Sequence, residues 1–88
     1  MKQFSLEEYL KDPSLKVVTR EGAEVRIQRV FEKNPAYPIF AIVYTSTIIN
    51  AFYTIDGKYW NDGCESPFDL FFVYNNVGIG INNNNIEN

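Results

Sequence analysis

Residues 53–60 read YTIDGKYW and place three aromatic side chains around an Asp-Gly pair. An Asp-Gly pair between alternating apolar runs is the strongest short signal for a β-hairpin, because both central residues of a type I′ turn need a positive φ. The sequence therefore predicts a hairpin with Asp56 and Gly57 at its tip. Tyr53 then meets Tyr59 or Trp60 across the two strands, a contact worth about 0.5–1 kcal/mol. We interpret these rings as sheet-stabilising residues, with a recognition surface as the alternative.

A period of two is also present before this hairpin, from Lys16 onward. The segment KVVT (16–19) predicts a short strand and REGA (20–23) a turn, and the alternation in EVRI (24–27) predicts a second strand paired with the first. Strict alternation would turn Arg29 into the core. We therefore expect a β-bulge or a strand end near residues 28–30, which returns Val30 or Phe31 to the core.

Two longer apolar segments follow the loop NPAYP (34–38), whose prolines remove hydrogen-bond donors from the backbone. The segment IFAIVYT (39–45) is apolar on both faces, so it predicts a central strand or one whose second face meets a helix or a partner. The segment TIINAFYTI (47–55) predicts the next strand. A last strand, Leu70 to Tyr74, follows one tight turn that starts at Ser66.

One short helix is predicted ahead of the strands, over about residues 5–12. Ser5 can accept a hydrogen bond from the Glu8 amide while Glu8 reaches back, and Phe4 can pack on Tyr9 one turn later. Such a helix is too short to be stable alone, so we expect it to cover a sheet. The apolar side that would cover it consists of Leu6, Tyr9 and Leu10.

Together these segments predict one mainly β domain with minor α content over residues 1–74, because a chain of 88 residues supports one core. Five or six short strands joined by tight turns favour a strongly bent antiparallel sheet or a partly open SH3-like barrel, with the helix over one mouth. Residues 75–88 are rich in asparagine and predict a flexible C-terminal extension, or a segment that docks on a neighbouring chain.

Composition excludes several classes of protein. The single cysteine, Cys64, rules out an intramolecular disulfide. The N-terminus lacks the apolar segment of a signal peptide, and the longest apolar run, residues 39–44, is too short to cross a bilayer. We therefore expect a cytoplasmic protein without membrane contact. A net charge of −3 with mixed signs suits solubility better than a nucleic-acid footprint.

Chemistry is restricted further because the chain contains no histidine, the commonest general base near neutral pH and the usual imidazole metal ligand. Asp62 and Glu65 flank Cys64 and would raise the pKa of its thiol, so we expect no reactive cysteine. The carboxylates Asp62, Glu65 and Asp69 miss the spacing of a calcium loop, and we interpret them as capping and solvated groups. The sequence predicts no enzyme activity, no cofactor and no metal.

The remaining class is a binding protein. The predicted strands present more apolar surface than one short helix can cover, and an exposed apolar surface of this kind usually marks an interface. The predicted contact set for a host protein, or for a second copy of the chain, is Phe40, Ile42, Tyr44 and Phe52, with Tyr59 and Trp60 at the rim. The competing prediction, nucleic-acid binding, uses Lys16, Arg20, Arg26, Arg29 and Lys33. Glu21, Glu24 and Glu32 interrupt that set and weaken it. Sequestration of a small molecule is a third hypothesis.

Five short segments stand in a characteristic order: VVTREG (17–22), Val25, YP (37–38) with Ala41 and Val43, YTIDGKY (53–59) and ESPFDLFF (65–72). In this order and spacing the chain resembles a family of small uncharacterised proteins encoded by phages and prophages. The resemblance covers about residues 4–74, and residues 75–88 depart from it. It carries no activity and no catalytic residues. It implies an accessory protein of a mobile element, a context in which small non-enzymatic proteins often occupy a host protein, including as inhibitors of defence or regulatory proteins.

Overall fold

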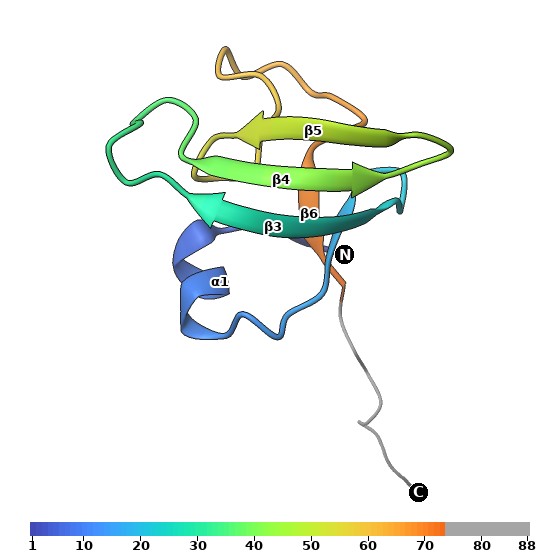
Figure 1. Cartoon of the computed structure of the whole chain (residues 1–88), viewed down its shortest axis with the longest axis horizontal. Helices are drawn as coiled ribbons and strands as arrows, with labels where there is room; N and C mark the ends of the chain where they lie inside the picture. The colour runs from blue at the N-terminus through green and yellow to red at the C-terminus, as the bar shows by residue number, and fades with distance from the viewer. Residues whose placement is uncertain (74–88) are drawn as a thin grey trace, which may run out of the picture.

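The computed structural model describes residues 1–73, so the predicted Asn-rich extension at 75–88 and Tyr74, the predicted end of the last strand, lie outside the described residues. The elements in chain order are β1 (Lys2–Gln3), α1 (Leu6–Lys11), β2 (Val17–Thr19), β3 (Glu24–Val30), β4 (Ile39–Tyr44), β5 (Ile48–Tyr53) and β6 (Leu70–Phe72). The strands form one antiparallel sheet in the order β1-β6-β2-β3-β4-β5. Figure 1 shows β3, β4 and β5 side by side in front of β6.

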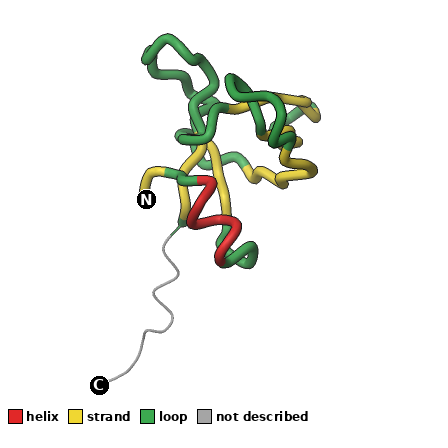
Figure 2. The backbone as a smooth tube through the Cα atoms, turned by 90° about the vertical axis from the view of Figure 1, so that its left-hand side faces the viewer, coloured by secondary structure: helices red, strands yellow, loops and turns green. Residues whose placement is uncertain are grey.

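The predicted fold class, mainly β with one short helix, is confirmed. The sheet bends so that β6 passes behind β3, β4 and β5 (Figures 1 and 2). It does not close into a barrel, because β1 and β5 lie at opposite ends of the strand order. The described sheet has six strands, but their membership differs from the prediction. β1 pairs with β6, whereas residues 58–60, expected as the second strand of the Asp-Gly hairpin, form a loop.

The core lies between the inner face of β3, β4 and β5 and the strands β2 and β6. Ile39, Ala41 and Val43 are fully buried on β4, which lies between β3 and β5. The prediction of a central strand at 39–45 is thus confirmed. The rest of the buried apolar cluster consists of Phe4, Val17, Val25, Ala51, Tyr53, Leu70 and Phe72. Since side chains alternate along a strand, the other residues of β4 point away from this core.

The expected β-bulge is present in β3. The register with β4 shifts between Ile27 and Arg29, so Gln28 is an extra residue. The shift keeps Arg29 exposed and makes Val30 half-buried. Of the two residues that the bulge was expected to return to the core, Val30 moves inward and Phe31 stays 39% exposed.

The helix α1 begins after Ser5 as predicted, but the Glu8 carboxylate accepts a hydrogen bond from Lys2 Nζ in place of the expected return to the cap. The Ser5 hydroxyl accepts a hydrogen bond from the Glu8 amide at 3.5 Å, and the ring centroids of Phe4 and Tyr9 are 6.1 Å apart. The expectation that Leu10 faces the sheet is wrong, because its side chain is 60% exposed. The helix ends one residue later, so only its first turn reaches the core.

The predicted type I′ turn at Asp56-Gly57 is also wrong. Only Gly57 has a positive φ, of 76°, and its amide donates to the Thr54 carbonyl at 2.9 Å. The turn is fixed by distant segments, because the Leu70 amide donates to the Gly57 carbonyl at 2.8 Å. A Cβ on Gly57 would lie 2.9 Å from the Phe4 side chain. The turn is closed locally, by the Thr54 amide that donates to the Lys58 carbonyl at 3.0 Å, and it is anchored by tertiary contacts to Leu70 and Phe4. The chain continues from it as a loop.

Candidate protein-binding surface

Alternate residues of β3, β4 and β5 point away from the core and form a face that α1 does not cover (Figures 1 and 2). The register places Arg29 opposite Phe40, and Phe40 opposite Phe52. We call this surface the outer face. Together with Phe31, directly after β3, it comprises Glu24, Arg26, Arg29, Phe31, Phe40, Ile42, Tyr44, Ile48, Asn50 and Phe52.

An aromatic cluster occupies one end of the outer face. The ring centroid of Phe52 lies 5.1 Å from that of Phe40 and 6.4 Å from that of Phe31. Phe52 is nevertheless 46% exposed. The other two predicted contact residues, Ile42 and Tyr44, continue along β4, with Ile42 half-buried and Tyr44 exposed. The structure thus brings the four central residues of the predicted contact set onto one surface.

Two arginines from β3 border this apolar surface. Arg26 Nε donates to Glu24 Oε2 at 2.7 Å, and this hydrogen-bonded carboxylate raises the pKa of the guanidinium above its usual value. The Arg26 guanidinium lies 5.9 Å from the ring centroid of Tyr44, and that of Arg29 lies 5.7 Å from the ring centroid of Phe31. Both distances allow cation–π attraction. The outer face therefore combines apolar area with positive charge.

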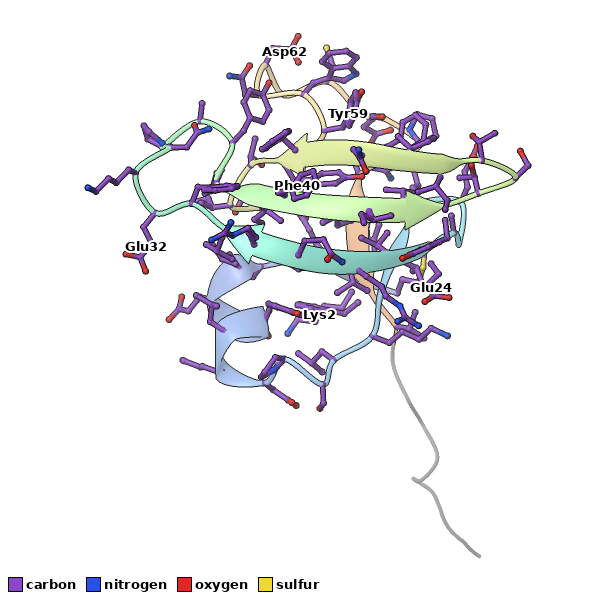
Figure 3. The ribbon with its side chains drawn as sticks, viewed as in Figure 1. Lys2, Glu24, Glu32, Phe40, Tyr59 and Asp62 are labelled. Carbon is purple, nitrogen blue, oxygen red and sulfur yellow. The ribbon has the colours of Figure 1, made fainter. Side chains whose placement is uncertain are left out.

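Tyr59 lies on the loop that follows β5 (Figure 3), and Trp60 is the next residue of that loop. Their ring centroids are 4.8 Å apart. With Tyr37 and residues 50–52 of β5 they line an open groove of about 290 Å³. This volume is at the lower limit for small-molecule sites. The groove places the two predicted rim residues beside Phe52.

The loop that carries Tyr59 is held by the buried carboxylate of Asp69. That carboxylate accepts hydrogen bonds from the Tyr59 amide at 2.9 Å, the Ser66 amide at 3.0 Å and Arg20 Nη2 at 3.0 Å, and Lys58 Nζ lies 3.7 Å away. Burial by itself would raise the pKa of Asp69, but these hydrogen bonds and charges outweigh it and hold the pKa below its usual value. The capping interpretation of Asp69 is confirmed.

Tyr53 packs beneath the same loop. Its ring meets that of Tyr59 edge to face at a centroid distance of 6.1 Å, so the predicted contact between these rings forms without a paired strand. The Tyr53 hydroxyl is buried without a hydrogen-bond partner among the described residues. Burial also raises the pKa of this phenol. The ring therefore stabilises the core, whereas its buried hydroxyl, without a partner among the described residues, lowers the stability of the fold.

The predicted nucleic-acid set is only partly assembled. Lys16 and Arg26 line one groove between the α1–β2 connection and β3, and Arg29 follows on the outer face. Arg20 is bound to Asp69 and stacks on Phe71 at 4.9 Å. Lys33 lies exposed in the loop between β3 and β4. Ion pairs thus engage Arg20 and Arg26, and the five cations do not form one continuous phosphate track.

Cys64 and the neighbouring acids carry no catalytic arrangement. The Cys64 thiol is exposed, and a hydrogen bond with Asp62 raises its pKa, which disfavours the reactive thiolate. Asp62 accepts the Cys64 amide at 2.9 Å, and this bond lowers the pKa of the carboxyl. Asp62 therefore caps a turn, as the sequence predicts, and Glu65 lies exposed.

Sequence reasoning missed several residues of the surface. Ile48 is 68% exposed at the start of β5, and Phe31 belongs to the aromatic cluster. The grouping of Arg29 with Phe40 follows from the bulge and from cross-strand register. Alternation within TIINAFYTI was a usable signal for Ile48, because it shares parity with Phe52.

Among residues 1–73, no three side chains of the types that bind metals cluster as a site, and no helix has the length and apolarity needed to traverse a bilayer. No protein-family model, curated protein or solved structure matches the chain.

Proposed function

We propose that this protein is a non-enzymatic protein-binding module that contacts its partner through the outer face. One observation carries the proposal: Phe40, Ile42, Tyr44 and Phe52 share a sheet face that the described chain leaves uncovered. A sheet usually buries an apolar face against another layer. A contiguous exposed apolar patch on a soluble domain is a feature of interaction sites.

The proposed partner is a bacterial host protein, and the proposed effect is inhibition of a defence or regulatory function. Support for this context comes from the resemblance to phage and prophage proteins. The SH3-like arrangement and the cytoplasmic location likewise stay predictions. A second copy of the chain is the alternative partner, since an apolar face can also close a symmetric dimer.

Affinity capture from a bacterial lysate with a matched pair of variants tests the proposal. Phe52→Glu places a charge in the aromatic cluster, and Leu10→Glu places the same charge on the exposed side of α1. The Leu10 side chain is 60% exposed and that of Phe52 46%, and neither belongs to the buried core, so we expect both variants to fold. We expect the wild type and Leu10→Glu to retain one stoichiometric partner that Phe52→Glu loses, and the purified partner to rebind with the same pattern.

Light scattering of the purified chain determines its oligomeric state in the same experiment. A monomer that captures a partner through Phe52 supports the host-protein proposal. A dimer that Phe52→Glu dissociates assigns the face to a second copy. Equal capture by all three proteins would contradict the assignment of the outer face.

Nucleic-acid binding is the second candidate, favoured by Arg26 and Arg29 beside aromatic rings. It predicts an affinity for single-stranded oligonucleotides that falls steeply with salt and is lost in Arg29→Glu. Fluorescence anisotropy at low and at higher salt measures the affinity of the wild type and of Arg29→Glu. Absence of binding at low salt would exclude this candidate.

A further inference from the structure

The outer face has an ordered distribution of charge. Its apolar residues follow β4 and its arginines follow β3, while β5 contains no charged residue at all. Arg26 shares its charge with Glu24, whereas Arg29 lies over the Phe31 ring and has no ion pair within the described chain. The surface is therefore an apolar stripe whose β3 margin has a net positive charge, since Glu24 offsets one of the two arginines.

The length of this stripe suits a helix. β4 and β5 each have six residues, which span about 20 Å at the rise of a strand. A helix of about 13 residues has the same length. A sheet face is covered in stable domains by helices or by a second sheet, and the chain's own helix, α1, lies on the other side of β3, β4 and β5 (Figures 1 and 2).

The number of available charges favours a protein over a nucleic acid. The electrostatic affinity for nucleic acid grows with the number of phosphates that the protein neutralises. The outer face offers two guanidinium groups, one already paired. A few acidic side chains along one flank of a helix match that number and would fix its orientation on the sheet.

We propose that the occupant of the outer face is an amphipathic helix of the partner, about three to four turns long, with acidic residues on the flank that faces β3. This inference rests on the proposed function and makes it more specific. The apolar stripe of the helix lies along β4, over Phe40 and Ile42, and one acidic side chain pairs with Arg29.

Two synthetic helical peptides of about 14 residues test this inference. Both carry the same leucine stripe, and one has glutamates where its twin has lysines on one flank. Each peptide is titrated by fluorescence anisotropy into the wild type, into Arg29→Glu and into the control Lys33→Glu, which reverses an exposed charge in the neighbouring loop. A single-stranded oligonucleotide is titrated in the same way. Light scattering of the chain alone shows whether it forms a dimer.

We expect the wild type and Lys33→Glu to prefer the acidic peptide by about tenfold, and Arg29→Glu to reverse the preference. Equal affinity for the two peptides, or binding of neither, would overturn the helix assignment. It would leave Phe52-dependent capture of a partner intact, so the two proposals fail separately. Arg29-dependent binding of the oligonucleotide, or a dimer that buries the face, would also overturn the assignment.

Discussion

Two aromatic regions of this protein differ in what holds their rings. In the loop after β5, Tyr59 contacts Tyr53, Phe68 and Trp60, and its amide is bound by the buried carboxylate of Asp69. On the outer face, the Phe52 ring packs on its neighbours and still remains 46% exposed. Tyr59 is therefore a structural residue, because a buried carboxylate fixes its backbone. Phe52 is a candidate for binding, because no further layer of the described chain covers it.

The largest effect is expected from removing Asp69. Asp69→Ala should lower the free energy of unfolding by about 3 kcal/mol, because the Tyr59 and Ser66 amides and the Arg20 guanidinium lose a buried acceptor. Urea unfolding measures it. The control Asp62→Ala removes an exposed carboxylate and should cost much less, because water replaces its hydrogen bond to the Cys64 amide. Equal losses would show that Asp69 does not hold the loop.

A smaller loss is expected at the turn that precedes this loop. Gly57→Ala should cost about 2 kcal/mol, because a Cβ there combines a positive φ with a contact of 2.9 Å to Phe4. The control Gly22→Ala has a similar φ but open space around it, and should cost about 1 kcal/mol. Chemical denaturation of both variants checks the difference. Matching values would mean that packing on Phe4 adds nothing.

Acid should weaken the same loop more gently than substitution, because protonation leaves the Asp69 side chain in place. The folded pKa of Asp69 lies below its unfolded value of about 3.9. Its contribution to stability is therefore complete well above that pH and is lost as the pH falls through the folded pKa. The melting temperature of the wild type should fall more steeply below about pH 4 than that of Asp69→Asn. If the melting temperatures of the wild type and of Asp69→Asn fell in parallel with pH, the ionised Asp69 carboxylate would not stabilise the fold.

The smallest expected effect has the opposite sign. Tyr53→Phe should raise the free energy of unfolding by about 1 kcal/mol, because it removes a buried hydroxyl that has no partner and keeps the ring contact with Tyr59. Thermal and urea unfolding measure the gain. A loss of stability would instead reveal a hydrogen-bond partner for this hydroxyl.

Much of the fold could be predicted from local pattern. Alternation identified β2 to β5, and the position of Arg29 in that alternation predicted the bulge in β3. The Asp-Gly turn could not be predicted, because Asp56-Gly57 suits two turn types and the choice depends on packing against Phe4 and Leu70. β1 was missed because two residues carry no periodicity.

The candidate surface could be predicted in part from the same alternation of side chains along a strand. Phe40, Ile42 and Tyr44 share one parity within a single strand, so alternation alone placed them together. The addition of Arg29 and Phe31 depended on how the bulge sets the register between β3 and β4. Cross-strand neighbours of this kind need the register, which no single segment contains.

Hydroxyl-radical footprinting of the chain, free and bound to its captured partner, tests whether the outer face is the binding surface. We expect Phe31, Tyr44 and Phe52 to become protected in the complex, while Leu10, which lies on α1 and is more open to solvent, reacts at an unchanged rate. Protection of Leu10 with unchanged reactivity at Phe52 and Tyr44 would contradict the claim that the outer face is the binding surface.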